Sequence, residues 1–121
     1  MSNNNDIKSV VWMGDSLKQV KSFPEEVRRD IGSSLYDAQL GDKPKGAKPF
    51  KGAGKGVFEI VTRFDSDTYR TVYAVQIGNC VYVLHAFMKK SPKGIKTAHR
   101  DVELIKKRYK AAIERSKENR Q

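Results

Sequence analysis

Apolar residues in the first third of the chain recur at intervals of three and four positions, the spacing of one face of an α-helix. Pro24 interrupts the run, because proline removes a hydrogen bond inside a helix but suits a helix start. Glu25 and Glu26 follow it, where acids interact well with the helix dipole. We therefore predict two helices, at 16–22 and 24–40, that bury the following side chains: Leu17, Val20, Val27, Ile31, Leu35 and Ala38.

A third helical pattern lies near the end of the sequence. Thr97 can cap its start, because a threonine hydroxyl accepts a hydrogen bond from an unpaired backbone N–H. Residues 98–116 then carry one apolar stripe, which consists of Ala98, Val102, Ile105, Tyr109 and Ala112.

Segments rich in β-branched and aromatic residues predict four strands. They are 9–14, 57–65, 69–77 and 80–90. The dipeptide Gly78-Asn79 favours a two-residue hairpin turn, and the polar triplet 66–68 predicts a second hairpin. The order β-α-α-β-β-β-α is typical of the α+β class. We expect a small twisted antiparallel sheet with the helices packed on one face.

Alternation along these strands sorts their side chains onto two faces of the sheet. A turn at 78–79 places Arg70 opposite Phe87, and a turn at 65–68 places Arg63 opposite Arg70. One face is then apolar and is expected to hold the helices: Phe58, Ile60, Phe64, Tyr69, Tyr73, Val75, Ile77, Tyr82, Leu84 and Met88. The other face is mixed and is expected to be open: Glu59, Val61, Arg63, Arg70, Val72, His85, Phe87 and Lys89.

The mixed face has the composition of a surface that binds an anion. Arginine offers a fixed fork of donors that fits a phosphate group, and an aromatic side chain can stack on a nucleobase. Structural alternatives stay open for single residues. Glu59 could simply pair with an arginine, and His85 could be a half-buried structural histidine. Lys89 and Lys90 could be a solvated strand end.

The segment 41–56 differs from the rest of the chain, since it contains five glycines, two prolines and five lysines. This composition predicts a loop without regular structure, and loops of this length are often functional. It lacks the GxxxxGK[ST] pattern of a phosphate-binding P-loop. We expect Lys51 and Lys55 to contribute phosphate contacts from this loop.

Charge is the strongest global feature of the sequence. The chain carries 24 Lys and Arg against 14 Asp and Glu, a net charge of +10. Residues 1–41 hold 5 basic and 6 acidic side chains, whereas residues 42–121 hold 19 and 8. A basic field in one part of a small protein favours a nucleic acid, an acidic protein or an anionic membrane surface as partner. We expect one of the first two.

The length of 121 residues predicts one domain, at 9–116, between a disordered start at 1–8 and a frayed tail at 117–121. No apolar run is long enough for a transmembrane helix, and the first residues lack the features of a signal peptide. We therefore expect a cytoplasmic protein without a membrane partner. The single cysteine, Cys80, excludes an internal disulfide and a cysteine-based metal cluster, and we expect neither metal nor cofactor.

Four stretches, taken in order and spacing, resemble a known family. They are 57-VFEIVTRF-64, 69-YRTVYAV-75, 84-LHAFMKKSPKGIKT-97 and 100-RDVELIKKR-108. The pattern resembles the phage-derived, HigB-like branch of the RelE/ParE toxin superfamily and covers about residues 9–110. The matching residues are Glu59, Arg63, Tyr69, Arg70, Tyr73, His85, Phe87, Lys89, Lys90, Lys96, Thr97 and Arg100.

The resemblance implies a RelE-like fold and the toxin of a type II toxin–antitoxin system. Toxins of this kind are ribosome-dependent mRNA endonucleases that inhibit translation and arrest growth. The implied partners are the ribosome with its mRNA and a cognate antitoxin, often a helix-turn-helix protein. Some members of the superfamily act on gyrase, so a gyrase-targeting toxin or a basic protein-interaction module without enzymatic activity stays open as the alternative.

Metal-independent RNA cleavage uses the ribose 2′-OH as nucleophile, so the site must accept one proton, donate another and stabilise a charged phosphorane. We expect Arg63 and Arg70 to hold the phosphate. Histidine titrates near neutral pH, so His85 could move a proton, and a lysine beside two arginines could serve as the base. The expected catalytic set is Arg63, Arg70, His85, Lys89, Lys90 and Tyr73, and the further RNA-binding residues are Lys51, Lys55, Phe87, Lys93, Lys96 and Arg100.

Overall fold

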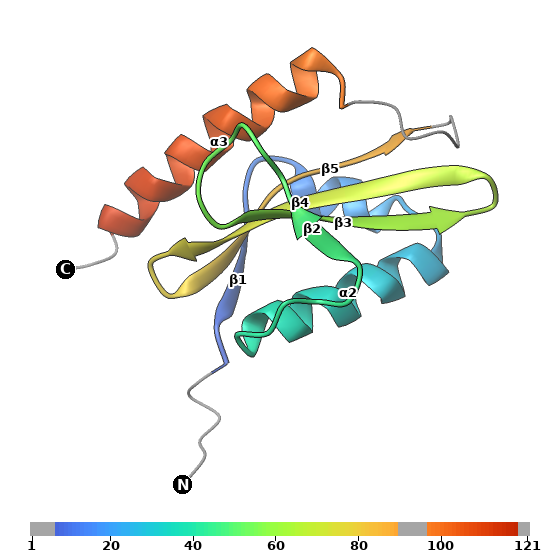
Figure 1. Ribbon diagram of the computed structural model, residues 1–121, viewed down its shortest axis with the longest axis horizontal. Helices are drawn as coiled ribbons and strands as arrows, with labels where there is room; N and C mark the ends of the chain where they lie inside the picture. The colour runs from blue at the N-terminus through green and yellow to red at the C-terminus, as the bar shows by residue number, and fades with distance from the viewer. Residues whose placement is uncertain (1–6, 90–96, 119–121) are drawn as a thin grey trace, which may run out of the picture.

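The computed structural model describes residues 7–89 and 97–118 (Figure 1). Most of the expected disordered start and part of the expected tail lie outside these ranges, as do Lys90, Lys93 and Lys96. The elements, in chain order, are β1 (Ser9–Trp12), α1 (Ser16–Lys21), α2 (Glu25–Gln39), β2 (Ala47–Pro49), β3 (Val57–Phe64), β4 (Asp67–Ile77), β5 (Cys80–Lys89) and α3 (His99–Glu118). The fold belongs to the α+β class, as the sequence predicts, and the three predicted helices are present.

The sheet has five strands in the order β1-β5-β4-β3-β2. Neighbouring strands from β2 to β5 are antiparallel, but β1 runs parallel to β5. The expectation of a wholly antiparallel sheet is therefore wrong at this edge. Hairpin turns force consecutive strands to be antiparallel, whereas most of the chain separates β1 from β5 and leaves the direction of their pairing free.

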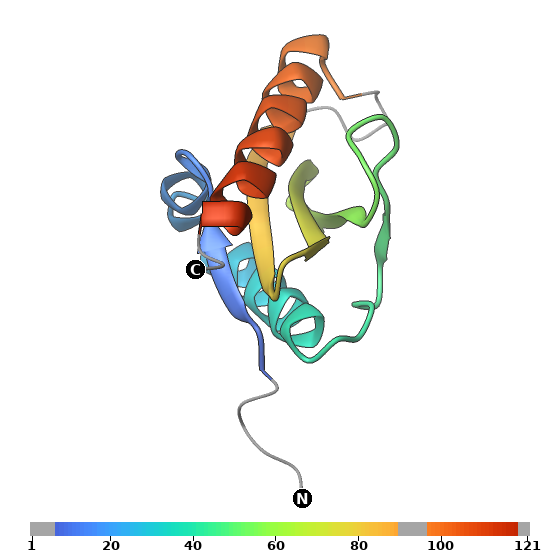
Figure 2. The same ribbon diagram turned by 90° about the vertical axis from the view of Figure 1, so that its left-hand side faces the viewer.

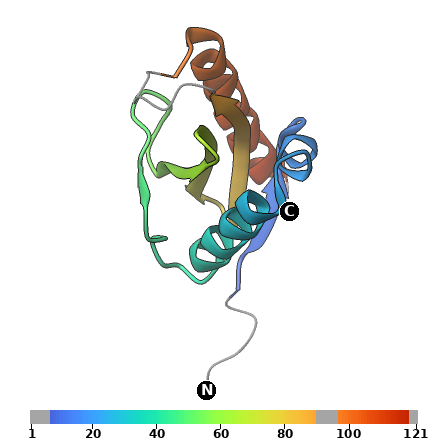
Figure 3. The same cartoon turned by 90° about the vertical axis from the view of Figure 1, so that its right-hand side faces the viewer.

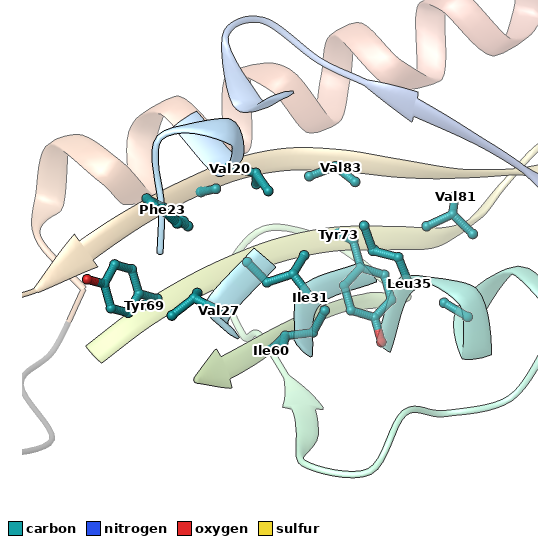
Figure 4. Close-up of a cluster of buried hydrophobic side chains, with 12 residues drawn as sticks. Val20, Phe23, Val27, Ile31, Leu35, Ile60, Tyr69, Tyr73, Val81 and Val83 are labelled. Carbon is teal, nitrogen blue, oxygen red and sulfur yellow. The ribbon is translucent and has the colours of Figure 1, made fainter. Parts of the chain in front are cut away.

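Helices cover both faces of the sheet, contrary to the expectation that all would pack on one face. Figures 1 and 2 show α2 on one side and α3 on the other. The apolar cluster beneath α1 and α2 contains Val20, Phe23, Val27, Ile31, Leu35, Ala38, Ile60, Tyr69, Tyr73, Val81, Val83 and Ala86 (Figure 4). The cluster beneath α3 contains Met13, Phe50, Val57, Val72, Ala74, Ile77, Tyr82, Leu84, Phe87, Ile105 and Ala112.

A β-bulge in β5 explains how the second face acquires its core. Val72 pairs with His85, but the next residue of β4 pairs with Val83. Leu84 is therefore an extra residue, and side chains on the two sides of it follow opposite alternation. A second register shift lies closer to the β4–β5 turn. Three residues predicted for the other face are consequently buried against α3: Ile77, Tyr82 and Leu84.

The turn between β3 and β4 is tighter than predicted. Asp65 and Ser66 alone form it, both with positive φ (53° and 72°), as a type I′ hairpin requires. Arg63 therefore pairs with Thr68, and Arg70 pairs with a residue two positions before Arg63. The predicted pairing of the two arginines is wrong by two residues. A slip of two keeps every side chain on its predicted face, so both arginines still share one.

The 41–56 segment is folded against the domain, contrary to the prediction of a loop without regular structure. Its residues 47–49 form β2, which pairs antiparallel with the start of β3. Phe50 is buried beneath α3. Gly54 packs so closely on the ring of Tyr109 that a Cβ would lie 2.3 Å from it. Figures 2 and 3 show the segment arching from the end of α2 along the β3 side of the sheet, with its tip toward α3.

Arg108 links α3 to β5 and to the residue that precedes α1. Its Nη1 donates to the carbonyl oxygen of Leu84 at 3.0 Å, and its Nη2 donates to Oδ1 of Asp15 at 2.9 Å. Asp15, the residue before α1, makes no side-chain cap bond. Instead, the hydrogen bond from Arg108 lowers the pKa of its carboxyl, and a further bond from Gln19 adds to the effect.

None of the described helices is long and apolar enough to cross a membrane.

Candidate active site

Three rows of paired side chains cross β3, β4 and β5 on the face that α3 partly covers. Directly paired residues in antiparallel strands project to the same side and lie next to each other. The rows are Arg63–Thr68–Lys89, then Val61–Arg70–Phe87, then Glu59–Val72–His85. Lys48 of β2 pairs with Glu59 and extends the last row by one strand. The register therefore gathers most of the predicted chemistry on one small part of the sheet.

Glu59 and Arg70 form a buried ion pair within these rows. Nη1 of Arg70 donates to both carboxylate oxygens of Glu59, at 3.2 and 3.0 Å. The two residues are only 6% and 8% exposed. A buried carboxylate is costly unless it is paired, so the expectation that Glu59 pairs with an arginine is confirmed. Within the described residues, Nε of Arg70 is buried without a hydrogen-bond partner.

An open pocket of about 440 Å³ lies at the corner of these rows next to β2. Its lining consists of Gly46, Lys48, Val61, Arg63 and Arg70. Three of these five side chains are cationic, and a single buried carboxylate, Glu59, balances one of them. Arg63 is exposed. The pocket therefore presents net positive charge and guanidinium donors, which suit a phosphate group.

A second polar group lies where β5 approaches the first turn of α3. Nε2 of His85 lies 2.8 Å from Oδ1 of Asp101, and Nζ of Lys89 lies 3.9 Å from Oδ2 of the same carboxylate. The side chains of His85, Asp101 and Lys89 are 8%, 16% and 23% exposed. Lys89 ends the row that begins with Arg63, so this group adjoins the pocket across one strand.

Phe87 separates the two polar residues of β5 and belongs to the core. Its ring stacks on that of His85, with centroids 4.9 Å apart and planes at 24°. Nζ of Lys89 lies 5.8 Å from the centre of the same ring. Because Phe87 is 9% exposed and packs beneath α3, the prediction that it offers an open surface for a base is not supported. His85 is equally enclosed, since its Nδ1 is buried without a partner in the described part of the chain.

Tyr73, a predicted catalytic residue, lies on the other side of the sheet. It is 1% exposed, belongs to the cluster beneath α2 and stacks on Phe58 at 5.9 Å. Burial raises the pKa of its phenol to about 12. Tyr73 is therefore a core residue and no part of the three rows, because alternation along β4 turns it away from Arg70.

Three further predicted RNA-binding residues, all within the described ranges, lie outside the pocket. Lys51, Lys55 and Arg100 are exposed. The carbonyl oxygen of Lys55 accepts a hydrogen bond of 3.4 Å from the Tyr109 hydroxyl, so the main chain of the 41–56 segment is fixed at this point. Within residues 7–89 and 97–118, no cluster of His, Cys, Asp or Glu is suited to hold a metal ion.

Two residues of the site are absent from the predicted set. Asp101 lies in the first turn of a helix, where an acid is explained by the helix dipole alone. Lys48 lies in a segment predicted to lack regular structure. Neither position carries a local signal of its contact with the sheet, because the approach of α3 to β5 and the pairing of β2 with β3 are tertiary events.

A model of a known protein family matches most of the chain. The family described as "phage derived protein Gp49-like (DUF891)" matches residues 18–110. The match includes the three rows, the pocket and Asp101. No curated protein matches the sequence.

Proposed function

The chain belongs to the phage-derived Gp49-like family, which is related to RelE-type toxins, and from this membership we propose that it is the toxin of a type II toxin–antitoxin system. Its proposed activity is metal-independent cleavage of mRNA on the ribosome, which inhibits translation. Its proposed partner is a helix-turn-helix antitoxin whose binding covers the pocket.

The observation that carries the proposal is that the basic pocket lies on the same face of the sheet as Lys89, whose amino group can exchange a proton. Arg63 and Arg70 line the pocket, and Lys89 ends the row that starts at Arg63. RNA cleavage needs donors for the phosphate oxygens and a group that exchanges a proton within reach of them. The guanidinium groups of Arg63 and Arg70 and the amino group of Lys89 lie on one face of the sheet, and this arrangement supports the proposal.

In the proposed reaction the 2′-oxygen attacks the adjacent phosphorus as its proton passes to a solvent water in the open pocket. The bond from phosphorus to the 5′-oxygen then breaks, and that oxygen gains a proton. The products are a 2′,3′-cyclic phosphate and a free 5′-OH, so no water or cofactor is consumed. Arg63 and Arg70 stabilise the extra charge on the phosphorane, because preorganised donors favour the charge that develops in the transition state.

Residues of the rows and of the surrounding surface have the remaining proposed roles. Lys89 is partly exposed and donates the proton to the leaving 5′-oxygen. His85 does not touch the RNA in this scheme, because Asp101 occupies its Nε2 and its Nδ1 is buried. Lys51, Lys55 and Arg100 supply phosphate contacts outside the pocket, a role that their exposure allows.

Growth arrest and mRNA mapping test the proposal together. The chain is expressed from an inducible promoter, and the 5′ ends of cellular mRNA are sequenced after induction. We expect growth arrest with cuts in phase with codons, and an Arg63→Ala variant that neither arrests growth nor cuts mRNA at equal protein level. Arg29→Ala is the matched control, because Arg29 is an exposed arginine on α2, with a side chain that is 73% exposed.

Three results would contradict the proposal. Growth arrest with intact mRNA and DNA damage would indicate a toxin that acts on gyrase. A chain without any toxicity would indicate a plain binding module. Full toxicity of Arg63→Ala would show that the pocket is not the site.

A further inference from the structure

Asp101 joins two side chains that leave the same face of β5 at its end. His85 and Lys89 are four residues apart on a strand, so both project toward α3 with Phe87 between them. Asp101 meets both from the first turn of α3, with Oδ1 on His85 and Oδ2 toward Lys89. One carboxylate therefore links a buried imidazole to a partly exposed ammonium.

The contact with His85 fixes the carboxylate. The distance of 2.8 Å is that of a hydrogen bond, and a carboxylate can only accept, so Nε2 of His85 donates. In the neutral ring Nδ1 then has no proton, which agrees with its burial without a partner among the described residues. The imidazole of His85 stacks on Phe87 and therefore has little freedom to turn. Its Nε2 thus holds Oδ1 of Asp101 in a fixed position.

The contact with Asp101 restricts the side chain of Lys89. A lysine has a flexible four-carbon stem, and a strand end allows it many rotamers. Oδ2 of Asp101 at 3.9 Å and the face of Phe87 at 5.8 Å both attract the ammonium. Together they keep it on the side of the sheet that carries Arg63.

We propose that Asp101 is a positioning residue of the cleavage site: His85 anchors one carboxylate oxygen, and the other holds the ammonium of Lys89 beside the Arg63–Arg70 pocket. Asp101 acts through Lys89 and does not contact the RNA. The inference rests on the proposed function, since it gives His85 a role in the same site.

The test compares three variants in cleavage by purified ribosomes programmed with a short mRNA, under single-turnover conditions. Asp101→Asn keeps an oxygen for His85 but removes the charge that faces Lys89. Asp101→Glu keeps the charge in the first turn of α3 but moves the carboxylate by one methylene. Glu103→Gln is the matched control, because it removes an exposed acid from the same helix, where Glu103 forms ion pairs only with His99 and Lys106 among the described residues.

We expect Asp101→Asn and Asp101→Glu to lower the maximal cleavage rate on the order of 100-fold, the scale of a positioned proton-transfer group. The ribosome concentration for half-maximal rate stays within about twofold, because the phosphate contacts are intact. Glu103→Gln cleaves like the wild type. If Asp101→Glu is fully active while Asp101→Asn is not, Asp101 serves only the helix dipole and the positioning role is wrong.

The ring nitrogens of His85 give a readout that does not depend on cleavage. In ¹⁵N spectra of the free wild-type protein we expect Nε2 of His85 protonated and Nδ1 bare, with exposed His99, the other of the two histidines, as internal reference. Asp101→Ala should convert this into a mixture of tautomers. A wild-type ring with its proton on Nδ1 and none on Nε2 would overturn the anchor, because Nε2 could not then donate to Asp101.

The two proposals fail in different ways. A wild-type chain that leaves mRNA intact contradicts the proposed function, whatever the state of His85. A wild-type chain that cleaves, together with an Asp101→Asn variant that cleaves equally well, contradicts only the positioning role.

Discussion

Nη1 of Arg70 holds both carboxylate oxygens of Glu59, at 3.2 and 3.0 Å, diagonally across β3 and β4 in the interior of the site. The pair fixes the guanidinium in one orientation while part of it still lines the pocket. An arginine that must bind a phosphate in a defined position gains from such a partner, because a preorganised group needs no rearrangement when charge develops.

The pair predicts unequal effects of single and double substitutions on stability. Arg70→Gln leaves the buried Glu59 carboxylate with only Lys48, whose Nζ lies 3.8 Å away, and should lower the free energy of unfolding by about 3–5 kcal/mol. The double variant Glu59→Gln/Arg70→Gln removes the uncompensated charge and should recover more than half of that loss. Urea unfolding measures both values.

Cleavage separates this stability effect from function. The double variant is folded but lacks the Arg70 guanidinium, so it should cleave no mRNA. A double variant as unstable as Arg70→Gln would contradict the assignment of the loss to a buried charge.

Arg63 should contribute to the salt dependence of ribosome binding. Each phosphate contact adds nearly one unit to the slope of log affinity against log salt concentration. Arg63→Gln should therefore reduce the slope by roughly 0.7–1. Sedimentation of labelled protein with ribosomes over a range of salt measures it.

Arg29→Gln provides the control for this slope, since it removes the same charge from α2 on the opposite side of the sheet. Equal slopes for wild type and Arg63→Gln would place Arg63 outside the contact with RNA.

Tyr73→Phe should leave cleavage unchanged, because Tyr73 lies in the core beneath α2. The free energy of unfolding at neutral pH should change by less than about 1 kcal/mol. Single-turnover cleavage and urea unfolding measure the two quantities. A large loss of cleavage with unchanged stability would return Tyr73 to the catalytic set.

The phenol of Tyr73 also predicts an effect at alkaline pH. Burial raises its pKa from 10.0 to about 12, so the unfolded chain ionises first as the pH rises. The stabilising contribution is complete below 10.0 and is lost between 10.0 and about 12. Tyr73→Phe should lose less stability than the wild type over this interval.

The Asp15–Arg108 pair should stabilise the fold at neutral pH, and this stabilisation should be lost in acid. The hydrogen bond from Arg108 lowers the pKa of Asp15 below its ordinary value of 3.8. Its contribution is therefore complete above 3.8 and is lost as the pH falls through the lower value of the folded state. Because the Asp15 side chain is 49% exposed, the contribution should be less than about 1 kcal/mol.

Urea unfolding of the wild type and Asp15→Asn over a pH series checks this prediction. The difference between the two should shrink as the pH drops below 3.8. Asp42→Asn, at an exposed carboxylate with no ion pair among the described residues, is the control. If the stability difference between the wild type and Asp15→Asn grew as the pH fell, the lowered pKa of Asp15 would be contradicted.

Local sequence determined the elements and the pairing nearest to well-defined turns. The glycine of Gly78-Asn79 adopts a positive φ of 57° and leaves Ile77 opposite Cys80, as expected. Such features depend on residues that are close in sequence, so composition and alternation are sufficient to predict them.

The environment of each site residue was decided by tertiary structure. Alternation alone predicts that Arg63, Arg70, His85 and Lys89 share a face, and they do. It cannot predict that the Leu84 bulge supplies this face with a core. The apolar residues of α3 pack on that core, and the packed helix buries His85.

The sequence by itself determined the α+β class, three helices, the basic character of the chain and the common face of the arginines, because short periods and tight turns encode them. Only the tertiary structure decided that Glu59 binds Arg70, that Lys48 lines the pocket and that Asp101 meets His85 and Lys89. These contacts join residues 11 to 16 positions apart or on separate elements. They form when the elements pack, and no local period records which side chains will then meet.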